Sequence, residues 1–133
     1  MELKKTPFIE FELDPESKIL IQKWLPSTET MEDNEYQTEQ LGLVQMVKEN
    51  KAKKLLANTK DFYYTIGPKM QTWTSMNVNN EMYKAGLEKL AFIITPEMFA
   101  QISIEQTQDE NLDDCFEVKY FDNTDHALKW LKS

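Results

Sequence analysis

The chain contains one cysteine, Cys115, and one histidine, His126, the residue types that most often act as nucleophile, general base or metal ligand. One cysteine and one histidine cannot supply the four ligands of a structural zinc site. Asp114 directly precedes Cys115, and its charge disfavours the reactive thiolate. We expect His126 to lie solvated in the first turn of the last helix, without the partner and cleft that catalysis needs. These residues predict no catalytic site, no metal site and no cofactor.

Other chemistry-bearing motifs are equally weak. The three glycines are widely spaced, which excludes a P-loop and a dinucleotide fingerprint. The acidic residues within 109–114 lack the alternation, glycine and final glutamate of a calcium loop, so we interpret them as a solvated helix end. Glu97 and Glu105 are carboxylates that could pair, but neither has an evident partner. An enzyme is therefore the least favoured class of function.

An aromatic run, Phe62, Tyr63 and Tyr64, offers a binding surface instead. With Trp73 it could line an apolar pocket near the strand ends, where open α/β sheets bind ligands. Trp24, at the end of a predicted strand, is expected at the same edge. Phe62 and Trp73 fit the core better than a surface. Tyr63 and Tyr64 are consecutive, so extended backbone would point them to opposite sides and leave one exposed.

Thr65 is the candidate regulated position. It precedes a predicted helix that starts near Ile66 and tolerates Gly67 and Pro68 in its first turn. As the N-cap, its hydroxyl would satisfy a backbone N–H group. A phosphate on the same hydroxyl would be favoured by the helix dipole. Capping alone explains the residue, and both roles stay open.

Charge and composition narrow the partners. The net charge is −8, with 23 acidic residues against 15 basic ones, all of them lysine. This balance argues against nucleic acid and against an anionic membrane surface. A single cysteine fits a reducing compartment, and no segment has the pattern of a signal peptide or a membrane span. We expect one cytoplasmic domain covering residues 1–133.

The elements that must position these side chains follow from apolar periodicity. The first two strands form an antiparallel hairpin, and strands and helices alternate afterwards. The sequence thus predicts an α/β fold with one mostly parallel five-stranded sheet. The predicted strands are residues 8–13, 18–25, 53–57, 90–94 and 116–121. The predicted helices are residues 31–50, a helix from 66 interrupted near 78–80, residues 81–85, and helices beginning at 96 and near 124.

The closing segment, strand residues 118–122 followed by helix residues 127–131, resembles the tail of small bacterial proteins of the SpoIIAA-like superfamily, which includes STAS domains. The element order resembles that superfamily over nearly the whole chain. The resemblance implies a sheet in sequential strand order, with the loops after the strands forming one functional edge. In the sigma-factor antagonists of this group, the loop after the third strand carries a phosphorylated Ser/Thr. Thr65 and Gly67 match the phosphoacceptor and glycine of that motif, whereas Tyr64 and Ile66 depart from it.

Two functions remain in competition. The first is a non-catalytic regulatory or protein-binding module of STAS-like type, which contacts an unknown protein through Phe62, Tyr63, Tyr64, Thr65, Gly67 and Trp73. The second is a carrier or sensor of a small apolar or amphipathic ligand, bound near the carboxyl ends of the strands. A homodimer through helix faces is compatible with either function.

Overall fold

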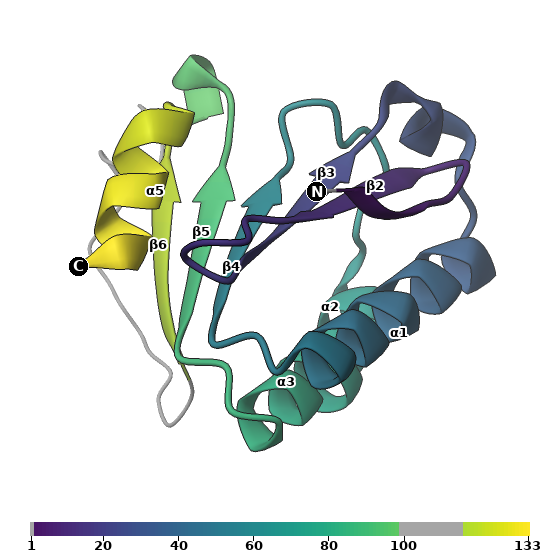
Figure 1. The fold of residues 1–133 in the computed structure, drawn as a ribbon. Coiled ribbons are helices and arrows are strands. Elements are labelled where there is room, and N and C mark those ends of the chain that lie inside the picture. Colours follow the sequence, from purple (N-terminus) through teal and green to yellow (C-terminus); the bar gives the residue numbers. More distant parts are fainter. Residues whose placement is uncertain (1, 99–115) are drawn as a thin grey trace.

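The computed structural model describes residues 2–98 and 116–133, which form an α/β fold (Figure 1). The strands are β1 (Glu2–Lys5), β2 (Ile9–Leu13), β3 (Ile19–Trp24), β4 (Lys54–Asn58), β5 (Lys89–Ile93) and β6 (Glu117–Phe121). The helical elements are η1 (Pro26–Thr30), α1 (Asp33–Asn50), α2 (Pro68–Thr74), the π-helical η2 (Ser75–Asn79), α3 (Asn80–Lys84) and α5 (Thr124–Lys132).

The described strands form one sheet in the order of the sequence, β1-β2-β3-β4-β5-β6. β2 is antiparallel to both β1 and β3, and β3 to β6 are mutually parallel. All five predicted strands form. The predicted five-stranded, mostly parallel sheet is wrong in its strand count, because β1 adds a sixth strand and the sheet is mixed. β1 is short, charged and non-alternating, and the ion pair of Lys5 with Glu10 at 3.4 Å joins it to β2.

The two faces of the sheet carry separate cores. Side chains alternate along a strand, so Leu20 and Trp24 pack on the face of α1, α2 and α3, whereas Ile19 packs on the face of α5. Figure 1 shows these helices on opposite sides of the sheet. Right-handed crossovers between parallel strands in sequential order place the connecting helices on one face. α5 follows the last strand, is not a crossover, and covers the other face.

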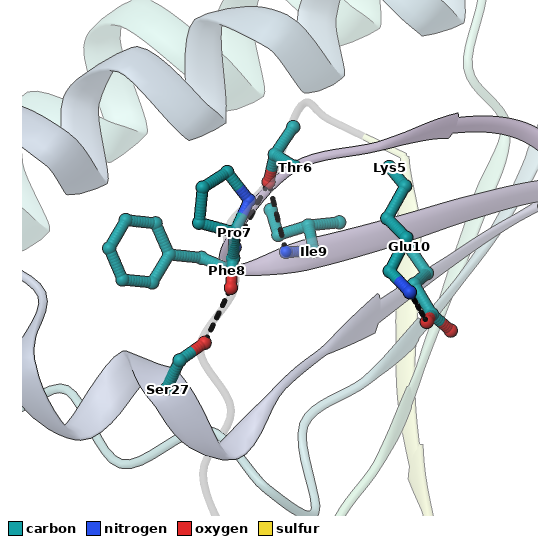
Figure 2. A network of polar contacts seen from close by, with 7 residues as sticks. All are labelled: Lys5, Thr6, Pro7, Phe8, Ile9, Glu10 and Ser27. Carbon is teal, nitrogen blue, oxygen red and sulfur yellow. Dashed lines mark hydrogen bonds and ion pairs between the residues drawn. The ribbon is translucent and has the colours of Figure 1, made fainter.

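The turn between β1 and β2 fixes the hairpin to the rest of the fold (Figure 2). The Thr6 hydroxyl oxygen accepts hydrogen bonds from the backbone N–H groups of Phe8, at 3.1 Å, and Ile9, at 3.0 Å. Ser27, in η1, donates from its hydroxyl to the Pro7 carbonyl at 2.6 Å. The Thr6 hydroxyl also donates to Glu39 of α1 at 2.9 Å, and burial raises the pKa of that carboxyl group. The hairpin is thereby linked to both η1 and α1.

The helix after the aromatic run begins later than predicted. The N-cap is Gly67, with extended backbone, and Pro68 is the first helical residue. A residue before proline is disfavoured in the helical region, and proline itself suits the first helical position. Thr65 therefore lies in the exposed loop before the cap, and the prediction that it caps this helix is wrong.

The predicted interruption near residues 78–80 is a π turn. α2 continues through η2 into α3 with helical dihedral angles at both junctions, Thr74 and Asn79. A π turn adds a residue to one helical turn and shifts the facing side chains without breaking the helix. The helical stretch ends as predicted at Gly86, whose φ of +107° ordinary side chains rarely adopt.

Two predicted helix starts are confirmed. Asn123 caps α5, its side chain accepting a bond from the His126 N–H group at 3.1 Å. The Thr95 hydroxyl accepts from the Met98 N–H group at 3.2 Å, as expected for the cap of the helix from residue 96. The rest of that helix, Glu105, the acidic run and Cys115 lie outside the described residues.

Gly86→Ala should lower the free energy of unfolding by about 1–3 kcal/mol, because alanine is strained at the positive φ that ends α3. Gly42→Ala, inside α1, is the matched control. It should raise stability by up to about 1 kcal/mol, since alanine is the better helix former and its Cβ meets only Lys4 Nζ at 3.8 Å. Urea titration of the three proteins measures both changes. Equal effects of the two substitutions would contradict this account of Gly86.

Candidate functional site

A cavity of about 160 Å³ lies between the sheet and its α1–α3 cover. Its floor comes from the three neighbouring parallel strands β3, β4 and β5. Their register places Gln22, Ala57 and Phe92 in one row across the sheet, with Leu55 and Leu90 in the row before it. Ala57 has the smallest side chain of these five residues and stands between the larger Gln22 and Phe92. The short alanine leaves space above the centre of the sheet.

Helix α1 contributes the facing wall. Tyr36, Gln40 and Leu43 line the cavity, and their spacing of four and three residues puts them on one helix face. Thr74 and Val78, from α2 and η2, line it from the neighbouring helix. The loop after β4 completes the lining with Phe62 and Ile66, among others. No described residue that lines the cavity is charged.

The aromatic side chains of the site form one cluster around Tyr36. Tyr64 stacks on Tyr36 with ring centroids 4.9 Å apart, and Trp73 meets it edge-on at 6.2 Å. Trp24 stacks at 6.3 Å from Tyr36 and makes an edge contact with Phe62 at 4.6 Å. Such offset and edge-to-face pairs stabilise a core beyond the area that they bury. The cluster fixes the position of the loop residues Phe62 and Tyr64 relative to α1.

A chain of hydrogen bonds runs through the Tyr36 hydroxyl. Thr74 donates from its hydroxyl to the Met70 carbonyl at 2.7 Å, so its oxygen is the acceptor for the Tyr36 hydroxyl at 2.6 Å. The Tyr36 oxygen in turn accepts from Gln40 Nε2 at 3.2 Å. The other end of the same amide, Gln40 Oε1, is buried and has no hydrogen-bond partner among the described residues.

A second orphan polar atom borders the cavity on the sheet side. Gln22 is 2 % exposed, and its Nε2 atom finds no partner in the described part of the chain. Buried amide groups are nearly always hydrogen-bonded, because an unpaired one costs about 1–3 kcal/mol. The cavity is therefore apolar overall but presents one unpaired donor, on Gln22, and one unpaired acceptor, on Gln40.

Thr28 and Asp33 hold the loop that covers this site. The buried Thr28 hydroxyl accepts from the Tyr63 N–H group at 2.8 Å, and it lies 3.1 Å from the Asp61 carbonyl as a donor. Tyr64 donates from its hydroxyl to the Asp33 carboxylate at the start of α1. Burial first, then the bond to Asp33 and its charge, raise the pKa of Tyr64. The loop is thus fastened to both η1 and α1.

The structure divides the predicted site residues into two groups. Phe62 lines the cavity, while Tyr64 and Trp73 pack beside it. Tyr63 is 54 % exposed and Thr65 is exposed, so both point away from the cavity. Gly67, also predicted as part of this edge, caps α2.

Sequence reasoning missed Gln22, Gln40, Thr28 and Ala57. A signal for Gln22 was present, because the period of two in β3 places it on the same face as Leu20 and Trp24. Gln40 likewise follows Tyr36 by four residues, on the buried face of α1.

Within the described ranges, no three His, Cys, Asp or Glu residues are grouped so that they could hold a metal ion. The same residues contain no helix that is long and apolar enough to cross a membrane. The His126 side chain is exposed at the start of α5. No protein-family model matches the chain, and no curated protein or solved structure matches it significantly.

Gln22→Met should raise the free energy of unfolding by about 1 kcal/mol, because an unbranched apolar side chain removes the unpaired buried amide while keeping its shape. Gln45→Met, at an exposed position of α1, is the control and should leave stability nearly unchanged. Urea denaturation of the unliganded proteins measures both values. A loss of stability in Gln22→Met would mean that the amide has a structural role in the free protein.

Proposed function

We propose that the protein is a non-catalytic carrier or sensor that binds a small, uncharged, mainly apolar ligand in the cavity between the sheet and α1. The observation that carries this proposal is the pair of unpaired amide atoms, Gln22 Nε2 and Gln40 Oε1, in an otherwise aromatic and aliphatic lining. Apolar walls with a few convergent polar groups are the usual composition of small-molecule sites.

The volume limits the size of the ligand. An engineered apolar cavity of about 150 Å³ in another protein accommodates benzene. The cavity here, at about 160 Å³, suits one ring with a small substituent and is too small for a nucleotide or a fatty acid. The absence of charged residues from its described lining favours a neutral ligand, because a buried charge without a partner is costly.

The loop above the cavity gives the sensor version a physical basis. Phe62 lines the cavity, and the next residue, Tyr63, is exposed. Thr28 binds the backbone on both sides of Phe62, at Asp61 and Tyr63. A ligand that displaces the Phe62 ring would therefore move the Tyr63 side chain on the surface.

We also propose that the chain is a SpoIIAA-like protein of the STAS-like type, with a cytoplasmic location. The sequential order of β3 to β6, their parallel pairing and the helices α1 to α3 on one face support this assignment. The closing strand and helix, β6 and α5, are the segments whose sequence resembles that group.

Recognition of a protein partner is the second candidate function. It is favoured by Tyr63, which is 54 % exposed, and by exposed Thr65 beside it. Thr65 is free of a capping role, so a phosphate on its hydroxyl would add charge to a contact surface without removing a helix cap.

Toluene should bind the wild-type protein, shift the NMR signals of residues around the cavity and raise Tm, because a ligand that binds only the folded state stabilises it. Ala57→Val fills the centre of the floor and should abolish these changes while leaving the protein folded. Thr72→Val, at an exposed position of α2, is the control and should bind toluene like the wild type. A wild-type spectrum that is unaffected by saturating toluene would refute the ligand cavity.

Tyr63→Ser should lose a protein partner that the wild type recovers by quantitative pull-down from the native host, since Tyr63 supplies exposed apolar area next to the loop. Tyr83→Ser is the matched control, because Tyr83 of α3 is 50 % exposed but lies on another element. Thr65→Glu tests the effect of negative charge on the same partner. Identical recovery by the wild type, Tyr63→Ser and Tyr83→Ser would count against this candidate function.

A further inference from the structure

We infer that the ligand is a neutral single-ring molecule with one hydroxyl group, of the phenol type, and that Gln22 and Gln40 recognise this hydroxyl together. The inference rests on the proposed function, since it names the class of ligand for the same cavity. It follows from the direction of the hydrogen bonds at the two amide groups and from the size of the space that they share.

The orientation of the Gln40 amide is set by the bonds behind it. The Thr74 proton is used on the Met70 carbonyl, so the Tyr36 proton is directed to Thr74. The Tyr36 oxygen can then only accept from Gln40, which turns Nε2 of that amide toward Tyr36 and leaves Oε1 unpaired. Gln40 therefore presents an acceptor, and the group that completes it must carry a proton.

Gln22 presents the complementary atom. Its Nε2 group is a donor without a described partner, from the strand that forms the floor. A carboxylate or another acceptor-only group would satisfy Gln22 and leave Gln40 unpaired, whereas an ammonium group would do the reverse. A neutral hydroxyl accepts one bond and donates another, so it can satisfy both.

The ring follows from the walls and the volume. Trp24, Tyr36 and Phe62 border the cavity, and aromatic walls favour edge and offset contacts with an aromatic guest. A volume of about 160 Å³ has room for one ring and one small substituent, so a single polar group has to serve both glutamines. Phenol is the smallest molecule with these properties.

Phenol and toluene form the test pair, because their shapes are nearly equal and only phenol has the hydroxyl. NMR titration of the full chain should give phenol an affinity at least tenfold higher than that of toluene, as expected when a site pays for unpaired polar groups with the wrong ligand. Gln22→Met and Gln40→Met should each reduce this preference several-fold by weakening phenol and not toluene. Gln45→Met should keep it. Benzoate should not bind measurably at neutral pH.

The outcomes separate the two levels of the proposal. Binding of neither phenol nor toluene would refute the ligand cavity itself. Equal affinities for the two, or a preference that both glutamine substitutions leave unchanged, would refute the hydroxyl inference and leave an apolar site. Retained toluene binding in Gln22→Met and Gln40→Met shows that each variant is folded with the cavity intact, so a lost preference reports on the hydroxyl.

Discussion

The parallel register of β3, β4 and β5 is the constraint on which the candidate site depends. It places Gln22, Ala57 and Phe92 side by side under α1, with the smallest residue in the middle. A shift of one residue in β4 would replace Ala57 by a larger neighbour and turn the row to the other face. The cavity is therefore a product of strand pairing, and the helices above it only close a space that the sheet has already left.

The unpaired amide atoms distinguish this cavity from a packing defect. A defect in an apolar core is lined by hydrocarbon and stays dry. Here Gln22 stands at a position where leucine or methionine would fit the alternation of β3, and its unpaired donor reduces the stability of the free protein. Local rules of protein stability are broken most often at functional sites, where a partner restores the missing bonds. The Tyr36 chain works in the same direction, because it fixes the free end of Gln40 as an acceptor.

Apolar alternation was sufficient to predict five strands and most helix positions, since burial on one face leaves a direct mark on the sequence. It failed for β1, whose pairing with β2 rests on backbone bonds and an ion pair, not on apolar residues. It also failed for the cap of α2, where the conformational effect of Pro68 on Gly67 outweighs the capping ability of Thr65. The aromatic part of the site was predicted from Phe62, Tyr64 and Trp73. The glutamines were missed because a polar residue within a strand or helix is usually taken to face solvent.

The two candidate functions share one structural element, the loop between β4 and α2. Its residues alternate between the cavity, at Phe62, and the surface, at Tyr63, and Thr28 holds the backbone between them. A ligand can shift such a loop only if it binds one loop position more tightly than another. The Phe62 ring supplies this difference, because it contacts both Trp24 and Tyr36 in the same wall that a ligand would occupy. Ligand binding and partner recognition would then be two ends of one equilibrium, with the surface around Tyr63 reporting the state of the cavity.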